Sequence, residues 1–217
     1  MGKELAMKEK VSAYKLLLIL LCLSVVDVAL AAINGTFAGN WIPWIERGRT
    51  VVVIVCLFLL GRDNWLYRCA AILMIPVFLI NMAQALTWQP VLEFWWEHED
   101  LYNILGRVIM VPQIVAMVFH WLGHGKTAPQ LRKHWVIFLI AHFVVATGFA
   151  LASSVVASQY IAQNISKEAM EAFYRVFGLS KTVTGVVYTY FLYRTAKIVK
   201  SKEAESRRIS PENVDTL

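Results

Sequence analysis

Apolar residues are concentrated in six long runs that are separated by short polar segments. A helix needs about 20 mostly apolar residues to cross the roughly 30 Å hydrocarbon core of a bilayer, and five of the runs approach this length. The second run is shorter and reaches it only with part of the preceding segment WIPWIERGR. The pattern predicts an all-α, polytopic membrane bundle of six transmembrane helices at Lys15–Ile33, Thr50–Gly61, Cys69–Thr87, Asn103–Gly123, His134–Ser158 and Phe173–Tyr193.

Basic residues between the runs predict which way the helices point. If both termini are cytoplasmic, fifteen Lys and Arg residues lie on the inner side and four on the outer side, as expected from the positive-inside rule. The eight tryptophans lie at or near predicted span ends, where an aromatic belt is expected. We therefore predict six spans with the N-terminus and the C-terminus both inside.

The first run has an alternative interpretation as a secretory signal peptide. Basic residues precede the apolar stretch LLLILLCLSVV, and the small residues ALA follow it, which is typical of a cleaved leader. Apolar character continues past Asp27 through VALAAI, which favours a retained span. Cleavage would leave five spans and an outer N-terminus.

Composition agrees with a membrane protein. The chain of 217 residues is 58% hydrophobic and 17% charged, against about 45–50% and about 25% in soluble domains. The net charge of +6 is explained by orientation, so we expect no nucleic-acid partner. No Walker loop, G-x-S-x-G elbow, HExxH or GxGxxG motif occurs, which argues against an enzyme. We expect the bacterial inner (plasma) membrane as the location.

The sequence predicts that the chain is divided into three segments. These are a cytoplasmic N-terminus (residues 1–14), the transmembrane domain (15–200) and a disordered cytoplasmic tail (201–217). An acidic outer loop, residues 89–101, predicts a short interfacial helix. A divalent cation bound by Glu93, Glu97, His98 and Asp100 is a weaker alternative for this loop.

Ionisable residues inside spans are costly in lipid and therefore mark candidate sites. Asp27, Arg107 and Lys181 lie about 7–12 Å below the outer boundary at about 1.5 Å per residue. Polar residues from the third and sixth spans share this layer or its inward faces: Asn81, Gln84, Thr184 and Tyr188. We predict a net-positive pocket that binds a small anionic or amphiphilic ligand for transport or sensing, without catalysis, metal or cofactor. Alternatively, Asp27 pairs with Lys181 or Arg107 and only holds helices together.

Histidines at the inner ends of the fourth and fifth spans support a different hypothesis. The segment Leu131–Trp135, followed by Thr147-Gly148, resembles one helix of the membrane b-type cytochromes, which include cytochrome subunits of hydrogenases and formate dehydrogenases. The resemblance implies an electron carrier with haem b between two imidazoles. Its candidate ligands are His120, His142 and His134. A third alternative is a non-catalytic accessory subunit with a membrane-subunit partner or a second copy of the chain.

Overall fold

The computed structural model describes residues 11–33, 42–86 and 88–209, and every regular element within these ranges is helical. The predicted all-α fold is confirmed. The helices are α1 (Ala13–Ile33), α2 (Ile42–Leu60), α3 (Trp65–Ala85), α4 (Gln89–Glu97), α5 (Glu99–Val108), α6 (Met110–Thr127), α7 (Arg132–Ile161) and α8 (Lys167–Ile209), with a 3₁₀ turn η2 (Pro129–Leu131) before α7.

Four stretches of helix in the described ranges are long and apolar enough to cross a membrane: Ala13–Ala31, Trp65–Ala85, Glu99–Thr127 and Pro129–Ile161. They correspond to the first, third, fourth and fifth predicted spans. Several long apolar helices are compatible with an integral membrane protein. A total of six spans stays a prediction.

The two remaining predicted spans lie in helices of more polar character. α2 begins with a segment that carries Glu46, Arg47 and Arg49 before its apolar half. The N-terminal half of α8 carries Arg175 and Lys181 together with several hydroxyl side chains. Both segments are helical, as predicted. Their charged residues lower the mean hydropathy from which a membrane span is assigned.

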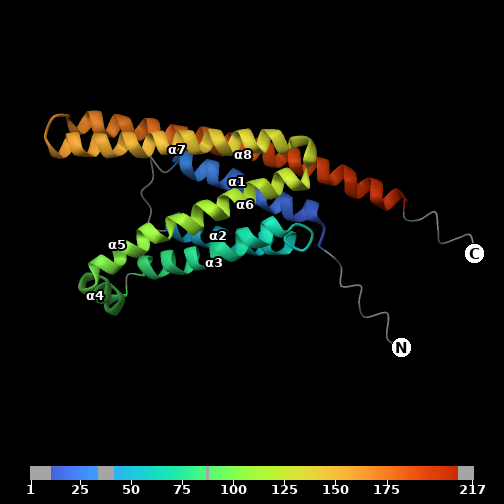
Figure 1. Ribbon diagram of the computed structural model, residues 1–217, viewed down its shortest axis with the longest axis horizontal. Coiled ribbons are helices and arrows are strands. Elements are labelled where there is room, and N and C mark those ends of the chain that lie inside the picture. The colour runs from blue at the N-terminus through green and yellow to red at the C-terminus, as the bar shows by residue number, and fades with distance from the viewer. Residues whose placement is uncertain (1–10, 34–41, 87, 210–217) are drawn as a thin grey trace, which may run out of the picture.

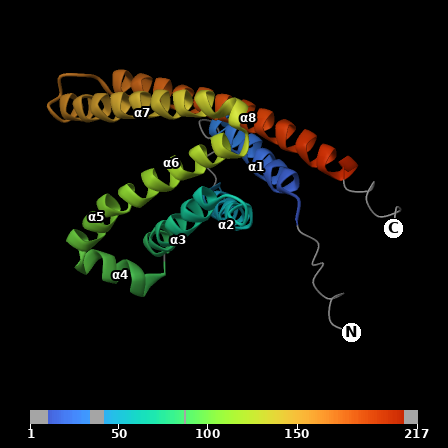
Figure 2. The same cartoon turned by 45° about the vertical axis from the view of Figure 1, so that its right-hand side comes forward.

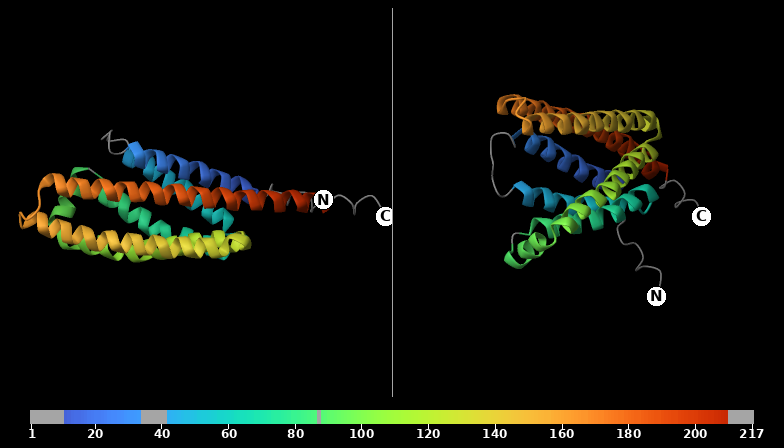
Figure 3. Two further views of the ribbon diagram at one scale, coloured as in Figure 1. Left: turned by 90° about the horizontal axis from the view of Figure 1, so that it is seen from above. Right: turned by 60° about the vertical axis from the view of Figure 1, so that its left-hand side comes forward.

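The helices converge at one end and separate at the other (Figures 1 and 2). α7 and α8 form a long antiparallel hairpin, with α1 against α8, while α2 and α3 form a second hairpin (Figures 1 and 3). α6 packs on α3 and leads through η2 into α7, so it connects the two hairpins. We call the convergent end, formed by the start of α1, the α2–α3 turn and the α6–α7 connection, the closed end. We call the end formed by the α7–α8 connection, α4 and α5 the open end.

The closed end contains the buried core. One cluster joins α1, α2, α3 and α8 and includes Leu17, Leu57 and Leu192, which are fully buried. A second cluster joins α6, η2 and α7 around Trp121 and Trp135. Since lipid is as apolar as leucine, close van der Waals packing rather than hydrophobic burial holds such membrane clusters together.

Asn64 ties two helices together at this end. Its side-chain oxygen accepts a hydrogen bond from the amide of Leu66 and so caps the start of α3. Its amide nitrogen donates to the carbonyl of Gly123 at 2.9 Å and to the hydroxyl of Thr127 at 3.2 Å, both on α6. Asn64 is buried, and these bonds satisfy both sides of its amide.

The open end exposes large apolar side chains. On α7, Val144 and Leu151 are each 67% exposed and Ile161 is 80% exposed. On α8, Leu179 and Val183 are also exposed. Apolar surface of this extent is unusual on a soluble monomer and is expected where helices contact lipid.

The two ends of the described chain meet at the closed end. The Ser12 hydroxyl donates a 2.5 Å hydrogen bond to Glu203, and the Tyr14 amide donates to the same carboxylate at 3.1 Å. Although the sequence predicts a disordered tail from residue 201, α8 continues to Ile209, because Glu203 anchors its last turns to α1. Residues 1–10 and 210–217 of the predicted terminal segments lie outside the described residues.

The acidic outer loop forms a helix, α4, as expected, followed directly by α5. His98 separates the two helices, and its ring stacks on Phe94 with centroids 4.6 Å apart. The place of α4 at a membrane interface stays a prediction.

Candidate functional site

A cavity of about 580 Å³ lies between α1, α2, α6 and α8. This volume is in the range of about 300–1,000 Å³ that is typical of small-molecule sites. The lining combines charged, hydroxyl and aromatic side chains with two glycines: Ser24, Asp27, Val28, Ala31, Glu46, Trp121, Tyr174, Phe177, Gly178, Lys181, Thr184, Gly185 and Tyr188.

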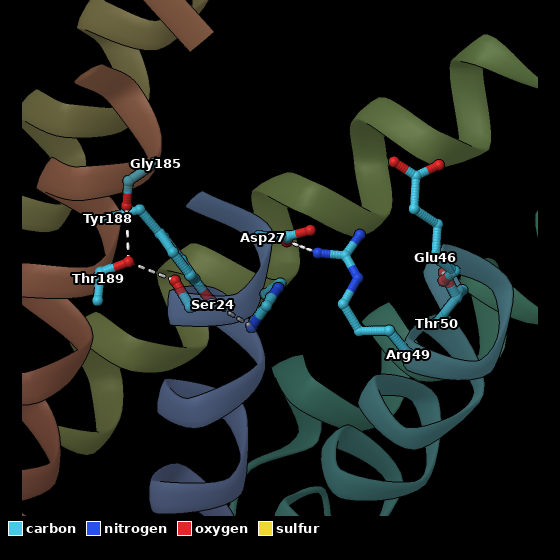
Figure 4. A network of polar contacts seen from close by, with 9 residues as sticks. Ser24, Asp27, Glu46, Arg49, Thr50, Gly185, Tyr188 and Thr189 are labelled. Carbon is cyan, nitrogen blue, oxygen red and sulfur yellow. Dashed lines mark hydrogen bonds and ion pairs between the residues drawn. The ribbon is translucent and has the colours of Figure 1, made fainter. Parts of the chain in front are cut away.

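The wall formed by α1 and α8 depends on close helix packing. The hydroxyl oxygens of Ser24 and Thr189 are 2.5 Å apart, and Thr189 also donates to the carbonyl of Gly185 at 2.7 Å (Figure 4). A Cβ at Gly185 would lie 3.0 Å from a methyl group of Val28. Glycine at position 185 therefore permits this approach of α1 and α8, as small residues do in membrane bundles.

An ion pair joins α1 to α2 beside the cavity. The guanidinium of Arg49 contacts the carboxylate of Asp27 (Figure 4). The sequence favours Lys181 or Arg107 as the partner of Asp27, whereas the structure pairs it with Arg49. The physical reason is that the first half of α2 packs beside the end of α1, which brings Arg49 next to Asp27.

Lys181 is the cation that the described lining residues contribute, and it has no ion pair within the described part of the chain. Its ammonium nitrogen lies 4.5 Å from the ring centroid of Phe177, an arrangement typical of a cation–π contact. Two carboxylates, Asp27 and Glu46, also line the cavity. With Arg49 beside Asp27, the site holds two cations and two anions, rather than the net positive charge expected from the sequence.

The structure brings together only part of the predicted site. Asp27, Lys181, Thr184 and Tyr188 line the cavity together. The remaining three predicted residues, Asn81, Gln84 and Arg107, are not among its lining residues. Gln84 instead donates to the carbonyl of Tyr102 on α5 at 3.3 Å. These three residues lie on α3, which packs along α6, and on α5, which precedes α6 and extends from it toward the open end (Figure 2).

Polar side chains gather behind the inner end of the cavity, where Tyr188 lies. The Tyr188 hydroxyl is 3.3 Å from Nε2 of His120 and 3.5 Å from Nε2 of His124. These two imidazole nitrogens are 3.1 Å apart. On its other side, Nδ1 of His124 is 2.8 Å from the hydroxyl of Tyr67. We call Tyr67, His120, His124 and Tyr188 the His–Tyr cluster.

Aromatic packing holds His124 in place. Its ring stacks on Trp135 with centroids 4.7 Å apart and planes 27° apart, and both residues are 0% exposed. The indole nitrogen of Trp135 donates to the hydroxyl of Thr195 on α8 at 3.1 Å. A Cβ at Gly123 would lie 2.7 Å from the Tyr67 ring, so glycine here gives Tyr67 access to His124.

Reasoning from the sequence missed several of these residues. Nothing in the spacing of Tyr67 on α3 shows that it meets α6, and Glu46 and Arg49 look like loop residues before an apolar run. One signal was present: His120 and His124 are four residues apart and so share a helix face.

The other candidate haem ligands lie apart from the His–Tyr cluster. His142 packs against Trp121 with ring centroids 4.9 Å apart, and His134 is exposed beside Phe191. The haem hypothesis stays a prediction. Among the described residues, which include the acidic outer loop, no group of three or more His, Cys, Asp or Glu side chains is arranged to hold a metal ion.

Comparison with known proteins adds no constraint on the site. No family model matches the chain, no curated protein is significantly similar to it, and no solved structure matches its fold.

Proposed function

We propose that the protein is an integral membrane protein that binds a small amphiphilic molecule with an anionic group in the cavity between α1, α2, α6 and α8. The observation that carries the proposal is the ammonium of Lys181 in the wall of this cavity, which has no ion-pair partner among the described residues and contacts the ring of Phe177 there. An unpaired charge at a membrane helix is costly, and this cost is reduced when a ligand of opposite charge binds.

The neighbouring charges favour an amphiphile over a simple anion. Asp27 is paired with Arg49, which leaves Lys181 as the charge available to an anionic group. Glu46 and the hydroxyls of Thr184 and Tyr188 supply polar partners for donor groups on the same ligand. The aromatic side chains of Trp121, Tyr174 and Phe177 supply apolar surface for its remaining part.

The proposed topology determines from which side of the membrane the ligand would enter the cavity. Six spans with both termini inside, in a bacterial inner membrane, would place Lys181 and Glu46 in the outer half of the bilayer. The hydrogen bonds of Glu203 to Ser12 and Tyr14 support an even number of crossings, because they hold the beginning of α1 and the end of α8 at one end of the molecule. A ligand entering from the outer side would be transported or sensed.

Binding of a soluble aromatic anion tests the proposal. Indole-3-acetate combines a carboxylate with an aromatic ring and partitions weakly into detergent. We expect it to raise the Tm of the purified full-length protein and to bind measurably in isothermal titration calorimetry. Lys181→Met should weaken this binding about 10–100-fold, since a hydrogen bond to a charged group contributes about 1.5–3 kcal/mol.

Lys197→Met is the matched control, because Lys197 is an exposed lysine on the same helix that does not line the cavity. It should leave the affinity unchanged. Equal affinity of the wild type and Lys181→Met, or no binding by the wild type of either indole-3-acetate or octanoate, would overturn the proposal.

A further inference from the structure

The His–Tyr cluster brings three atoms that can ligate a metal ion, from two residue types, within 3.5 Å of one another. The three separations among His120 Nε2, His124 Nε2 and the Tyr188 hydroxyl oxygen are 3.1, 3.3 and 3.5 Å. Two of the donors come from successive turns of α6, and the third comes from α8. The triangle is therefore set by tertiary packing and not by one helix alone.

These separations match the edges of a metal coordination shell. Ligands about 2.0–2.1 Å from a tetrahedral zinc ion lie about 3.3 Å from one another. The three observed separations, 3.1, 3.3 and 3.5 Å, are centred on this ligand–ligand distance. Three oxygen and nitrogen donors at these positions can bind one ion without moving far.

We propose that His120, His124 and Tyr188 form a binding site for a divalent first-row transition metal ion. Imidazole nitrogens suit Zn²⁺, Cu²⁺ and Ni²⁺, whereas Ca²⁺ and Mg²⁺ require oxygen ligands. Tyr188 binds as the phenolate, and its proton passes to water in the cavity. The site shares Tyr188 with the wall of the cavity but uses neither Lys181 nor Asp27.

The surroundings of His124 support metal binding. A ligating histidine usually donates its second ring N–H to an acceptor, which fixes the tautomer and the orientation of the ring. Tyr67 lies in this position, with its hydroxyl 2.8 Å from Nδ1 of His124. Stacking on the fully buried Trp135 restrains the ring further.

An ion can reach the site from the cavity. Tyr188 lines the cavity, and His120 and Tyr188 are only partly buried, whereas His124 is fully buried. Three protein ligands leave a tetrahedral ion with one further position, which water or another small donor can occupy. This arrangement differs from a closed structural site with four protein ligands.

A simpler account is a hydrogen-bonded imidazole pair without a metal. In that case Nε2 of His120 accepts from both Nε2–H of His124 and the Tyr188 hydroxyl, while Nδ1 of His124 accepts from Tyr67. This arrangement also accounts for the three separations, so metal binding has to be measured directly.

The experiment uses full-length protein purified without a polyhistidine tag and stripped with a chelator. After addition of Zn²⁺ and desalting, we expect about one bound zinc ion per chain by mass spectrometry of the metal. Zn²⁺ should also raise the Tm, because an ion that binds only the folded state stabilises it. Co²⁺ in the same site should give visible absorption bands of a non-octahedral complex.

Three variants separate the two accounts. His120→Gln should lose zinc, and Tyr67→Phe should weaken zinc binding about 10–100-fold, as the loss of an orienting partner usually does. His142→Gln is the control for a nearby histidine outside the triangle and should bind like the wild type. Lys181→Met should keep its zinc, which separates this result from the test of the proposed ligand.

The proposal is overturned if the wild type, once stripped and then incubated with Zn²⁺, holds no zinc after desalting and its Tm does not respond to Zn²⁺. It is also overturned if His120→Gln retains as much zinc as the wild type. Either result would identify the His–Tyr cluster as a hydrogen-bonded pair only.

Discussion

The closed and open ends of the molecule use the same helices in different ways. At the closed end, α1, α2, α3 and α8 bury Leu17, Leu57 and Leu192 completely against one another. At the open end, α7 and the start of α8 leave residues such as Leu151 and Leu179 largely exposed. The closed end therefore provides the packing that fixes the helices, and the separation of the helices toward the open end leaves room for the cavity.

The two ends also differ in how their polar groups are satisfied. The buried polar groups of the closed end bond within a fixed network, as in the contacts of Asn64 and Thr195. Toward the open end, Lys181 has no ion pair with any residue that the structure describes, and the cavity is lined by groups that can contact a ligand. Substitutions at the two ends should thus have different effects, and the following predictions run from the largest to the smallest.

Loss of the buried tryptophan should have the largest effect. Trp135→Ala removes a side chain that is 0% exposed and leaves His124 without its stacking partner. We expect a loss of about 3–5 kcal/mol in the free energy of unfolding, measured in mixed micelles. Leu151→Ala, at a position 67% exposed, should change it by less than about 0.5 kcal/mol. Similar losses for both variants would contradict the division between the two ends.

A methyl group added at Gly123, at the closed end, should lower the free energy of unfolding more than a methyl group added at Gly148, toward the open end. The new Cβ of Gly123→Ala would lie 2.7 Å from the Tyr67 ring, and relieving this overlap should cost about 1–3 kcal/mol. Gly148→Ala is the matched control, because among the described residues, apart from the chain neighbours and the adjacent backbone of α7, nothing lies within 4 Å of a Cβ there. Since alanine favours helix, Gly148→Ala should be neutral or slightly stabilising in the same unfolding measurement. An equal effect at both positions would show that Tyr67 does not pack on α6.

The hydroxyl pair between α1 and α8 should have a smaller effect. Ser24→Ala leaves Thr189 with only its bond to Gly185, and we expect a loss of about 0.5–1.5 kcal/mol. Ser153→Ala is the control, because Ser153 is bonded only to a carbonyl of its own helix. A neutral Ser24→Ala would indicate that α1 and α8 do not approach closely at this level.

The ion pair at the cavity should contribute least to stability. Asp27 is 44% exposed, and pairs of this kind contribute about 0.2–1 kcal/mol. We expect Asp27→Asn to lower the free energy of unfolding by no more than this. Glu171→Gln, which removes the partner of Lys167 and Arg175 within α8, serves as the control. A loss of several kcal/mol on Asp27→Asn would mean that the pair is enclosed and does not border an accessible cavity.

Much of the fold could be predicted from local signals. Each of the six predicted apolar runs lies largely in helix, and charges within these runs pointed to Asp27 and Lys181. These features depend on residues that are close in the sequence and on position along a single helix. Both can be inferred from one sequence.

Tertiary contacts could not be predicted in the same way. The depth of Asp27 suggested Arg107 or Lys181 as its partner, but the residue that it meets depends on how α2 lies beside α1, and that residue is Arg49. Tyr67 joins His124 only because Gly123 admits its ring. The helical end of α8 depends on contacts of Glu203 that lie far away in the sequence.

Cysteine modification in membranes tests most directly the claim that an accessible cavity lies beside a closed core. Thr184 and Thr195 lie on the same helix, but Thr184 lines the cavity and Thr195 is 0% exposed. The experiment uses a background in which Cys22, Cys56 and Cys69 have been replaced. A membrane-impermeant thiosulfonate should modify Thr184→Cys rapidly, and indole-3-acetate should slow that reaction. Thr195→Cys should stay unmodified. Equal modification of both cysteines, or protection of Thr184→Cys without any ligand, would contradict the account.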